Sequence, residues 1–187
     1  MNLEKVLKSL SVCSKRFLVN KVDRSVGGLI AQQQCCGDLH TPLVDYSLVA
    51  QSFFNKTGIA TSIGERPIIG LINPEAMVRM SIGEMLTNMM FCKIGKMEDI
   101  RCSGNWMWPL NMEGEKDRLY KSVKSMCECM EELGIALDGG KDSLSMTYKD
   151  NYKGKVIKSP GTLVVSGYTR VEDINKKTTP DFKNVGN

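Results

Sequence analysis

The fold of this chain is decided by the stretch Leu133-Gly134-Ile135-Ala136-Leu137-Asp138-Gly139-Gly140-Lys141-Asp142-Ser143. Gly134 predicts the end of a helix over residues 115–133, because glycine readily takes the left-handed conformation that stops a helix. The apolar Ile135 and Leu137 then predict a strand that leaves the core, and the residues from Gly139 onward predict a polar turn at its end. The stretch therefore indicates a helix followed directly by a strand.

The same turn is a candidate ligand-binding element. Its two glycines let a ligand approach the backbone, and a cation, a carboxylate and a hydroxyl follow them in Lys141, Asp142 and Ser143. The run lacks the glycine spacing and the Lys-Ser/Thr ending of a P-loop. A turn that needs only positive φ explains the glycine pair more simply. Taken alone, the run is a weak phosphate-binding signal.

A second helix is predicted upstream, beginning at Asn73-Pro74-Glu75 and running to about residue 91 or 92. Asn is a preferred cap, Pro suits the first turn, and an acid there lies beside the positive end of the helix dipole. Both helices carry apolar side chains at steps of three and four, which predicts one buried face each. These residues are Val78, Ile82, Met85, Leu86 and Met89 in the upstream helix, and Leu119, Val123, Met126, Met130 and Leu133 in the downstream helix.

Three apolar segments predict strands, at residues 43–50, 98–104 and 162–170. Residues 58–69 contain two glycines and Pro67, and they predict a strand, a loop and another strand edge. Together with the helices, these strands predict the α+β class: a mixed sheet with two main helices on one face.

Length and composition suit one globular domain. The chain has 187 residues, of which 42% are apolar and 25% charged, with a net charge of +4. We expect residues 21–171 to form the domain. We expect residues 1–20 to be a linker segment from an upstream region, and residues 172–187 to be a polar, mobile connector to a downstream domain.

Composition also excludes several function classes. The seven cysteines are an odd set without a CxxC or a Cys/His metal spacing, so we expect reduced, mostly buried thiols. The chain has only one histidine, His40, which argues against most histidine-based catalysis and against most zinc sites. No apolar run reaches the roughly 18 residues that a membrane span needs. No aromatic-basic stripe favours nucleic acid. We therefore expect a cytoplasmic protein that binds neither membranes nor nucleic acid.

Three residues form a candidate magnesium site. Glu84 and Asn88 are four residues apart on the predicted helix, so their side chains project from the same face. Carboxylate and amide oxygens are hard ligands that suit Mg²⁺. Asp45 lies in an otherwise apolar predicted strand, where an unpaired charge would be costly. A solvated helix face remains an alternative for Glu84 and Asn88, and a strand-end acid remains one for Asp45.

Six motifs, taken in order, point to a known family. The motifs are KVDRSVGGL, TPLVDYSLVA, ATSIGERP, GEMLTN, SGNWMW and GGKDSLSM. In this order they closely resemble the large, single-chain form of phosphoribosylformylglycinamidine synthase, over roughly residues 10–182. The resemblance implies the first subdomain of the second synthetase-like half. This part is similar to the N-terminal domain of aminoimidazole ribonucleotide synthetase, whose sheet pairs with a sister sheet. We accordingly expect the chain to be a fragment of a longer enzyme.

The resemblance also implies site residues. In that family the residues matching Asp45, Glu84 and Asn88 hold Mg²⁺, which bridges to the phosphates of an auxiliary nucleotide, ATP or ADP. The backbone at Val44 would contact that nucleotide, and a further aspartate ligand would come from a later subdomain.

A second cluster is implied nearer the catalytic ATP and the substrate phosphate. Its residues are Asn105, Gly140, Lys141 and Ser143. Arg24 and Ser25 are candidates to add to the anion-binding surface, and an exposed salt bridge remains an equal alternative for Arg24. The resemblance implies no general base or nucleophile within this chain.

The chemistry implied is an ATP-dependent amidotransfer in purine biosynthesis. ATP phosphorylates the amide oxygen of formylglycinamide ribonucleotide, and ammonia from a glutaminase domain displaces the phosphate. The alternatives are a structural nucleotide-binding scaffold and another synthetase or kinase of the same superfamily. The expected partners are the sister half and the glutaminase domain. An isolated chain would form a homodimer through its sheet, with the helices outside, because two helices cover only one sheet face.

Overall fold

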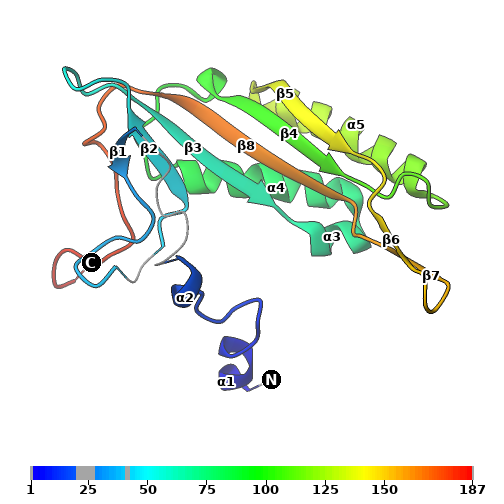
Figure 1. The fold of residues 1–187 in the computed structure, drawn as a ribbon. Helices are drawn as coiled ribbons and strands as arrows, with labels where there is room; N and C mark the ends of the chain where they lie inside the picture. The colour runs from blue at the N-terminus through cyan, green and yellow to red at the C-terminus, as the bar shows by residue number, and fades with distance from the viewer. Residues whose placement is uncertain (1, 20–27, 41–42, 187) are drawn as a thin grey trace.

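The computed structural model describes residues 2–19, 28–40 and 43–186. Its central element is a six-stranded sheet with the strand order β1-β2-β3-β8-β4-β5 (Figure 1). Every neighbouring pair is antiparallel except β4 and β5, which are parallel, so the predicted mixed sheet is confirmed. The strands are β1 (Leu29–Gln32), β2 (Tyr46–Ala50), β3 (Gly58–Glu65), β4 (Arg101–Met107), β5 (Ala136–Ser143) and β8 (Thr162–Val171).

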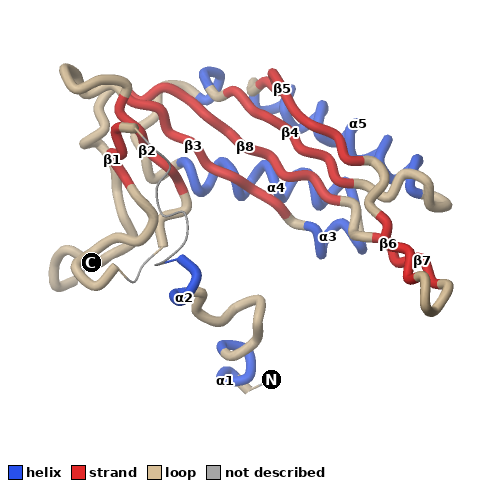
Figure 2. The backbone as a smooth tube through the Cα atoms, in the orientation of Figure 1, coloured by secondary structure: helices blue, strands red, loops and turns tan. Residues whose placement is uncertain are grey.

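The two long helices lie on one face of this sheet. Figure 1 shows α4 (Pro74–Met89) and α5 (Glu115–Leu133) side by side behind the strands. Within the described part of the chain, the opposite face carries no helix. The short elements are α1 (Leu3–Leu7), α2 (Arg16–Val19), α3 (Pro67–Ile72), the 3₁₀ turn η1 (Met97–Asp99) and a separate hairpin of β6 (Thr147–Asp150) and β7 (Lys155–Lys158), which Figure 2 shows projecting from one end of the sheet.

Both long helices begin and end close to where local chemistry predicts. The Asn73 side chain accepts a hydrogen bond from the backbone amide of Ala76 at 2.9 Å, and Pro74 occupies the first turn of α4. Gly134 follows α5 with φ of +68°, the left-handed conformation expected of a helix stop. The predicted caps of these helices are confirmed.

The main core lies between these helices and the sheet. It contains the helix residues Met77, Val78, Ile82, Met85, Met89, Met126, Cys129 and Met130, together with Ile100, Cys102, Trp106, Trp108, Ile135, Leu163 and Val165. Contact between α4 and β3 is very close at one point. A Cβ on Gly64 would lie 2.0 Å from the carbonyl oxygen of Ser81, so only glycine lets the helix backbone approach the strand there.

A smaller core joins the chain's last segment to the first strands. It contains Val44, Leu48 and Ala60, and the Tyr46 hydroxyl beside them donates to the carbonyl of Thr178 at 2.8 Å. The Lys177 ammonium bonds the carbonyl of Ala31 in β1. The part of segment 172–187 around Lys177 and Thr178 is therefore packed against the sheet, whereas the sequence predicted a mobile connector.

Several strand boundaries differ from the prediction. The strand predicted over 43–50 begins at Tyr46, and the one predicted over 98–104 runs from Arg101 to Met107 after the η1 turn. Pro67 starts α3 instead of a second strand edge, because proline suits the first turn of a helix. The predicted polar turn at Gly139–Ser143 is wrong: these residues belong to β5, and neither glycine has positive φ. The strand β1 and the β6–β7 hairpin were not predicted.

Most of the cysteines are buried, as the sequence predicted. Five of the seven cysteines are buried, and on α5 Cys127 is exposed while Cys129 is buried. No helix of the described residues is both long and apolar enough to cross a bilayer.

Candidate functional site

The predicted metal residues gather at one end of the β2–β3 ladder. Pairing between these strands ends where Tyr46 faces Ser62, so the residues of β3 after Ser62 extend beyond β2. Asp45 immediately precedes Tyr46, whereas Glu84 and Asn88 reach the extended part of β3 from α4. The structure thus brings elements far apart in the sequence to the same place.

Glu84 is held by two partners. Its carboxylate accepts a hydrogen bond from the backbone amide of Glu65 at 2.8 Å and forms an ion pair with Arg66 at 2.7 Å. A carboxylate offers about four lone-pair positions. These contacts orient Glu84 and leave acceptor capacity for a cation. The sequence did not predict Arg66 as its partner.

Asn88 is held in the complementary way. Its Nδ2 donates to the carbonyl of Ile63 at 3.1 Å, which leaves Oδ1 as the amide atom suited to a hard cation. Glu84 and Asn88 therefore bond two backbone groups of β3 that lie beyond the end of β2. A structural role and a ligand role are compatible for both side chains.

Asp45 and Val44 have different environments. Asp45 is exposed and lies just before β2, so it is a strand-end acid and carries none of the burial cost that made it anomalous in the sequence. Val44 is buried, in the smaller core. Among the described residues, no group of three His, Cys, Asp or Glu side chains could hold a metal ion. Two carboxylates and one amide suit Mg²⁺ only as a partial ligand set, which waters and phosphate oxygens would complete.

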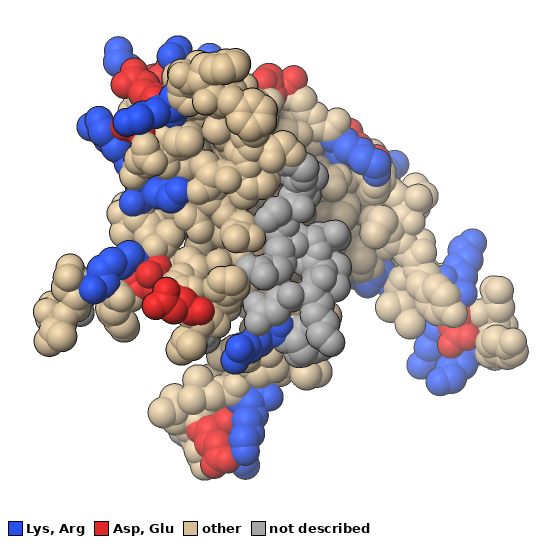
Figure 3. Space-filling model, turned by 60° about the vertical axis from the view of Figure 1, so that its left-hand side comes forward, with Lys and Arg blue, Asp and Glu red and all other residues tan. Residues whose placement is uncertain are grey.

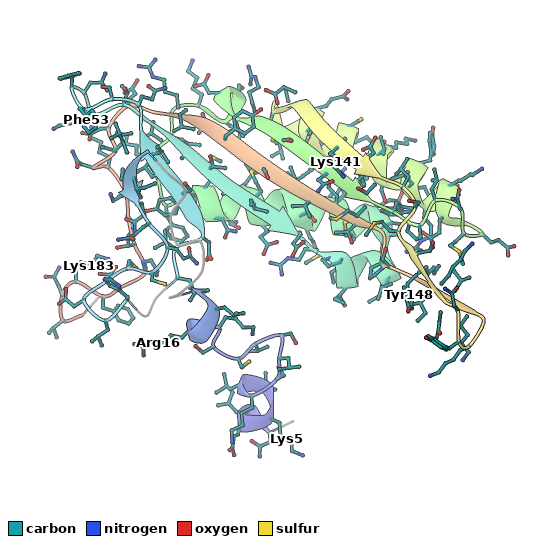
Figure 4. The ribbon with its side chains drawn as sticks, viewed as in Figure 1. Lys5, Arg16, Phe53, Lys141, Tyr148 and Lys183 are labelled. Carbon is teal, nitrogen blue, oxygen red and sulfur yellow. The ribbon has the colours of Figure 1, made fainter. Side chains whose placement is uncertain are left out.

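The second predicted cluster lies on the parallel pair β4–β5. Asn105 pairs in register with Lys141, and Met107 pairs with Ser143. The Lys141 ammonium donates to the Ser143 hydroxyl at 2.7 Å, and Figure 4 shows Lys141 on β5. The Oδ1 atom of Asn105 is buried and has no hydrogen-bond partner among the described residues. Such an orphaned acceptor is costly unless a partner is supplied from outside the chain.

Gly140 lies apart from these three side chains. Together with Asp142 and Trp106 it lines a cavity of about 480 Å³ on the α5 side, which Leu119 and Val123 close. A Cβ on Gly140 would lie 2.2 Å from the carbonyl oxygen of Gly104. The adjacent strand therefore requires glycine at this position, and no turn is involved.

A single row of paired residues connects the two clusters. Glu65, which bonds Glu84, faces Val164 in β8. Val164 in turn faces Asn105, which faces Lys141. Three strand spacings of about 4.8 Å separate the ends of this row by about 14 Å. The clusters are therefore separate subsites on one sheet. Arg24 and Ser25 lie outside the described residues.

Comparison with protein families shows which family this chain belongs to. The model of the family described as FGAR-AT PurM_N-like domain matches residues 14–170. This chain belongs to that family.

Curated relatives of this FGAR-AT PurM_N-like domain carry one name. The phosphoribosylformylglycinamidine synthase of Drosophila melanogaster is 55% identical over 98% of the chain, and that of Homo sapiens is 46% identical over 97%. The chain spans 13% of the length of each of these two relatives.

Solved structures confirm the fold of the FGAR-AT PurM_N-like domain. PurLQS from Thermotoga maritima superposes with a TM-score of 0.67 at 18% identity, covering 90% of this chain and 25% of that one. The T. maritima PurL complexed with ADP superposes with a TM-score of 0.65 at 18% identity, covering 90% of this chain and 26% of that one. The predicted α+β class is confirmed.

Proposed function

We propose that this FGAR-AT PurM_N-like domain works within a phosphoribosylformylglycinamidine synthase. The observation that carries this proposal is the 55% identity to the Drosophila enzyme over nearly the whole chain. The reaction would convert formylglycinamide ribonucleotide, ATP and glutamine-derived ammonia to formylglycinamidine ribonucleotide. Its remaining parts, including the sister half and the glutaminase domain, would be supplied by other domains in the cytoplasm.

Within that enzyme, the second cluster would bind phosphate. Lys141 places a positive charge beside the Ser143 hydroxyl, and both project near the orphaned acceptor of Asn105. Positioning and charge stabilisation account for most of the catalysis of phosphoryl transfer. T. maritima PurL structures are described as complexed with AMPPCP and with FGAR, which supports nucleotide and substrate binding here.

The first cluster would hold Mg²⁺ and an auxiliary nucleotide. Asp45, Glu84 and the Oδ1 of Asn88 would be ligands, with the backbone of Val44 near the nucleotide. The ion would supply charge neutralisation for its phosphates. The support is the shared location of these residues and the way Arg66 and Ile63 fix the two helix side chains.

A scaffold role for this nucleotide is the second candidate. Glu84 and Asn88 already tie α4 to the free part of β3, so a bound nucleotide would stabilise that junction. The sheet face without helices would pair with a sister sheet in the enzyme, and with a second copy when the chain is alone.

The decisive experiment uses a full-length enzyme that contains this domain. We expect ADP release that depends on glutamine and formylglycinamide ribonucleotide, and none from the 187-residue chain. Robust turnover by this chain alone, or no substrate-dependent turnover by the longer enzyme, would contradict the proposal.

Three variants of that enzyme separate the two subsites. Lys141→Met should raise KM for ATP or substrate, whereas Lys149→Met, on the distant hairpin, should not. Glu84→Ala should strip Mg²⁺ and nucleotide from the purified protein. If Glu84→Ala keeps its nucleotide through extensive dialysis, the metal assignment is wrong.

A further inference from the structure

The β6–β7 hairpin is a small sheet separate from the six-stranded one. Tyr148 pairs with Ile157 and Lys149 pairs with Val156. All four residues of β7 are exposed, and Tyr152 at the tip is 99% exposed. A two-stranded hairpin is marginally stable in water, and additional strands or packing normally support it. Among the described residues, β6 is the only strand that pairs with β7, so the outer edge of β7 presents unpaired backbone groups to solvent.

The base of this arm is firmly attached to the domain. The Lys158 ammonium forms a 2.6 Å ion pair with Glu115, a buried acid at the start of α5. Glu115 also lies 3.7 Å from the guanidinium of Arg118. The backbone amide of Ser159 bonds the carbonyl of Met146 at 3.1 Å, which closes the hairpin at its root. The root of the arm is thus attached to the start of α5.

The arm is positively charged. Lys149, Lys153 and Lys155 form none of the ion pairs found among the described residues. Its one acid, Asp150, accepts hydrogen bonds from the backbone amides of Tyr152 and Lys153 at 3.0 and 3.1 Å, so it shapes the turn. Figure 3 shows basic side chains beside acidic atoms on the projection at the right.

Apolar side chains lie on both faces of the arm. Because side chains alternate along a strand, Tyr148 and Ile157 share one face and Val156 lies on the other. A cavity of about 340 Å³ at the root is lined by Met146, Tyr148 and Ile157 among others. Tyr148 projects from this arm in Figure 4.

We propose that β7 is the docking edge for an acidic, extended segment of a partner protein, which adds to the hairpin as a third strand. Main-chain hydrogen bonds to β7 provide the pairing. Neighbouring side chains of the segment, which point to opposite faces, contact Val156 on one face and Ile157 on the other. Carboxylates of the segment face the three unpaired lysines, which gives the charge complementarity. This inference does not depend on the proposed enzymatic function.

Two features favour a protein segment over other anionic partners. A nucleic acid can accept hydrogen bonds from backbone amides, but it lacks the regularly spaced amides and carbonyls that would continue the strand ladder along β7. A lipid surface would favour apolar residues on one face only, whereas this arm has them on both. Nucleic acid and lipid are therefore included as competing outcomes of the test.

The test measures binding of a fluorescein-labelled heptapeptide, Glu-Val-Val-Glu-Val-Val-Glu, which as a strand has valines on both faces, to the 187-residue chain by anisotropy. We expect a dissociation constant on the order of 100 µM, because one short strand buries a small interface. Amide hydrogen exchange should slow in residues 155–158. A Lys-Val peptide of the same length should bind at least about tenfold more weakly.

Charge reversal supplies matched variants. Changing Lys149, Lys153 and Lys155 together to Glu should weaken binding of the acidic peptide about tenfold or more and favour the Lys-Val peptide. The same changes at Lys56, Lys93 and Lys116, which are exposed elsewhere, alter net charge equally and should leave binding unchanged. Circular dichroism verifies the fold of both variants.

Four results would overturn the proposal. They are equal binding by the hairpin variant, no binding of the acidic peptide, binding without slowed exchange in β7, and tighter lysine-dependent binding of a thymidine oligonucleotide or of phosphatidylserine vesicles. The last would identify a nucleic-acid or lipid site instead.

Discussion

The carboxylate of Glu84 accepts a hydrogen bond from the backbone amide of Glu65 at 2.8 Å, at a point where β3 extends beyond the end of β2. A helix side chain thus takes the place that a neighbouring strand would occupy. The same carboxylate is paired with Arg66 at 2.7 Å. Any cation at this site would bind a ligand that already stabilises the fold.

Glu84→Ala should therefore destabilise the chain even without metal. Removing the acceptor leaves the Glu65 amide and Arg66 without this partner, and we expect the free energy of unfolding to fall by about 1–3 kcal/mol. Glu128→Ala is the control, because its exposed pair with Lys124 spans 3.9 Å and should contribute less than about 0.5 kcal/mol. Urea denaturation compares the two. Equal effects would show that Glu84 has no role in holding β3.

The adjacent glycines of β5 should differ sharply in tolerance to alanine. A Cβ on Gly140 would lie 2.2 Å from the carbonyl oxygen of Gly104, so Gly140→Ala should displace β5 and cost about 1–3 kcal/mol of stability. A Cβ on Gly139 meets nothing within 4 Å, and Gly139→Ala should change stability by less than about 1 kcal/mol. Thermal melting gives both values. A tolerant Gly140 would mean that β4 and β5 separate easily.

Alkaline pH should weaken the fold through two buried thiols. Burial raises the pKa of both Cys92 and Cys102 from 9.0 to about 11. The folded chain then binds more protons than the unfolded chain between these values, so stability is full below about pH 9 and falls as pH rises to about 11. Cys102→Ala should flatten this slope, whereas Cys127→Ala, at an exposed thiol, should not. Urea denaturation at several pH values checks this, and an unchanged slope in Cys102→Ala would refute it.

Self-association should depend on the helix-free face of the sheet. Ile59 and Ile63 lie there in β3, exposed by 43% and 52%. Changing both to Lys should convert the expected dimer to a monomer, because it places charge in an apolar contact. The matched pair Ile68 and Leu71 in α3 is 66% and 55% exposed, and the same change there should leave the dimer intact. Light scattering at micromolar concentration shows whether each variant is a monomer or a dimer. A monomeric parent chain would rule out the dimer.

Local signals predicted the helices well. Asn73 and Gly134 determine their ends through contacts within one turn, so the sequence contains the necessary information. The Gly139–Gly140 pair led to the wrong prediction of a turn, because adjacent glycines are common in turns. Here parallel pairing with β4 keeps the backbone extended, and that partner lies more than thirty residues earlier in the chain.

In the candidate site, too, local features could be predicted from the sequence and tertiary contacts could not. The chemistry of Glu84 and Asn88 identified them as oxygen donors on one helix face. Their partners, Arg66 and the backbone of β3, could not be predicted, because only tertiary packing brings them together. Asp45 carries no burial cost in the structure, because β2 begins at Tyr46, three residues after the predicted start of the strand at residue 43.

The position of β8 has a consequence for how the protein is made. This strand lies between β3 and β4, yet it is the last of the six to leave the ribosome. Until residues 162–171 emerge, the inner edges of β3 and β4 have no partner, and such edges invite aggregation. Nascent chains stalled before residue 162 should therefore be bound by chaperones, and release should follow once the central strand is available.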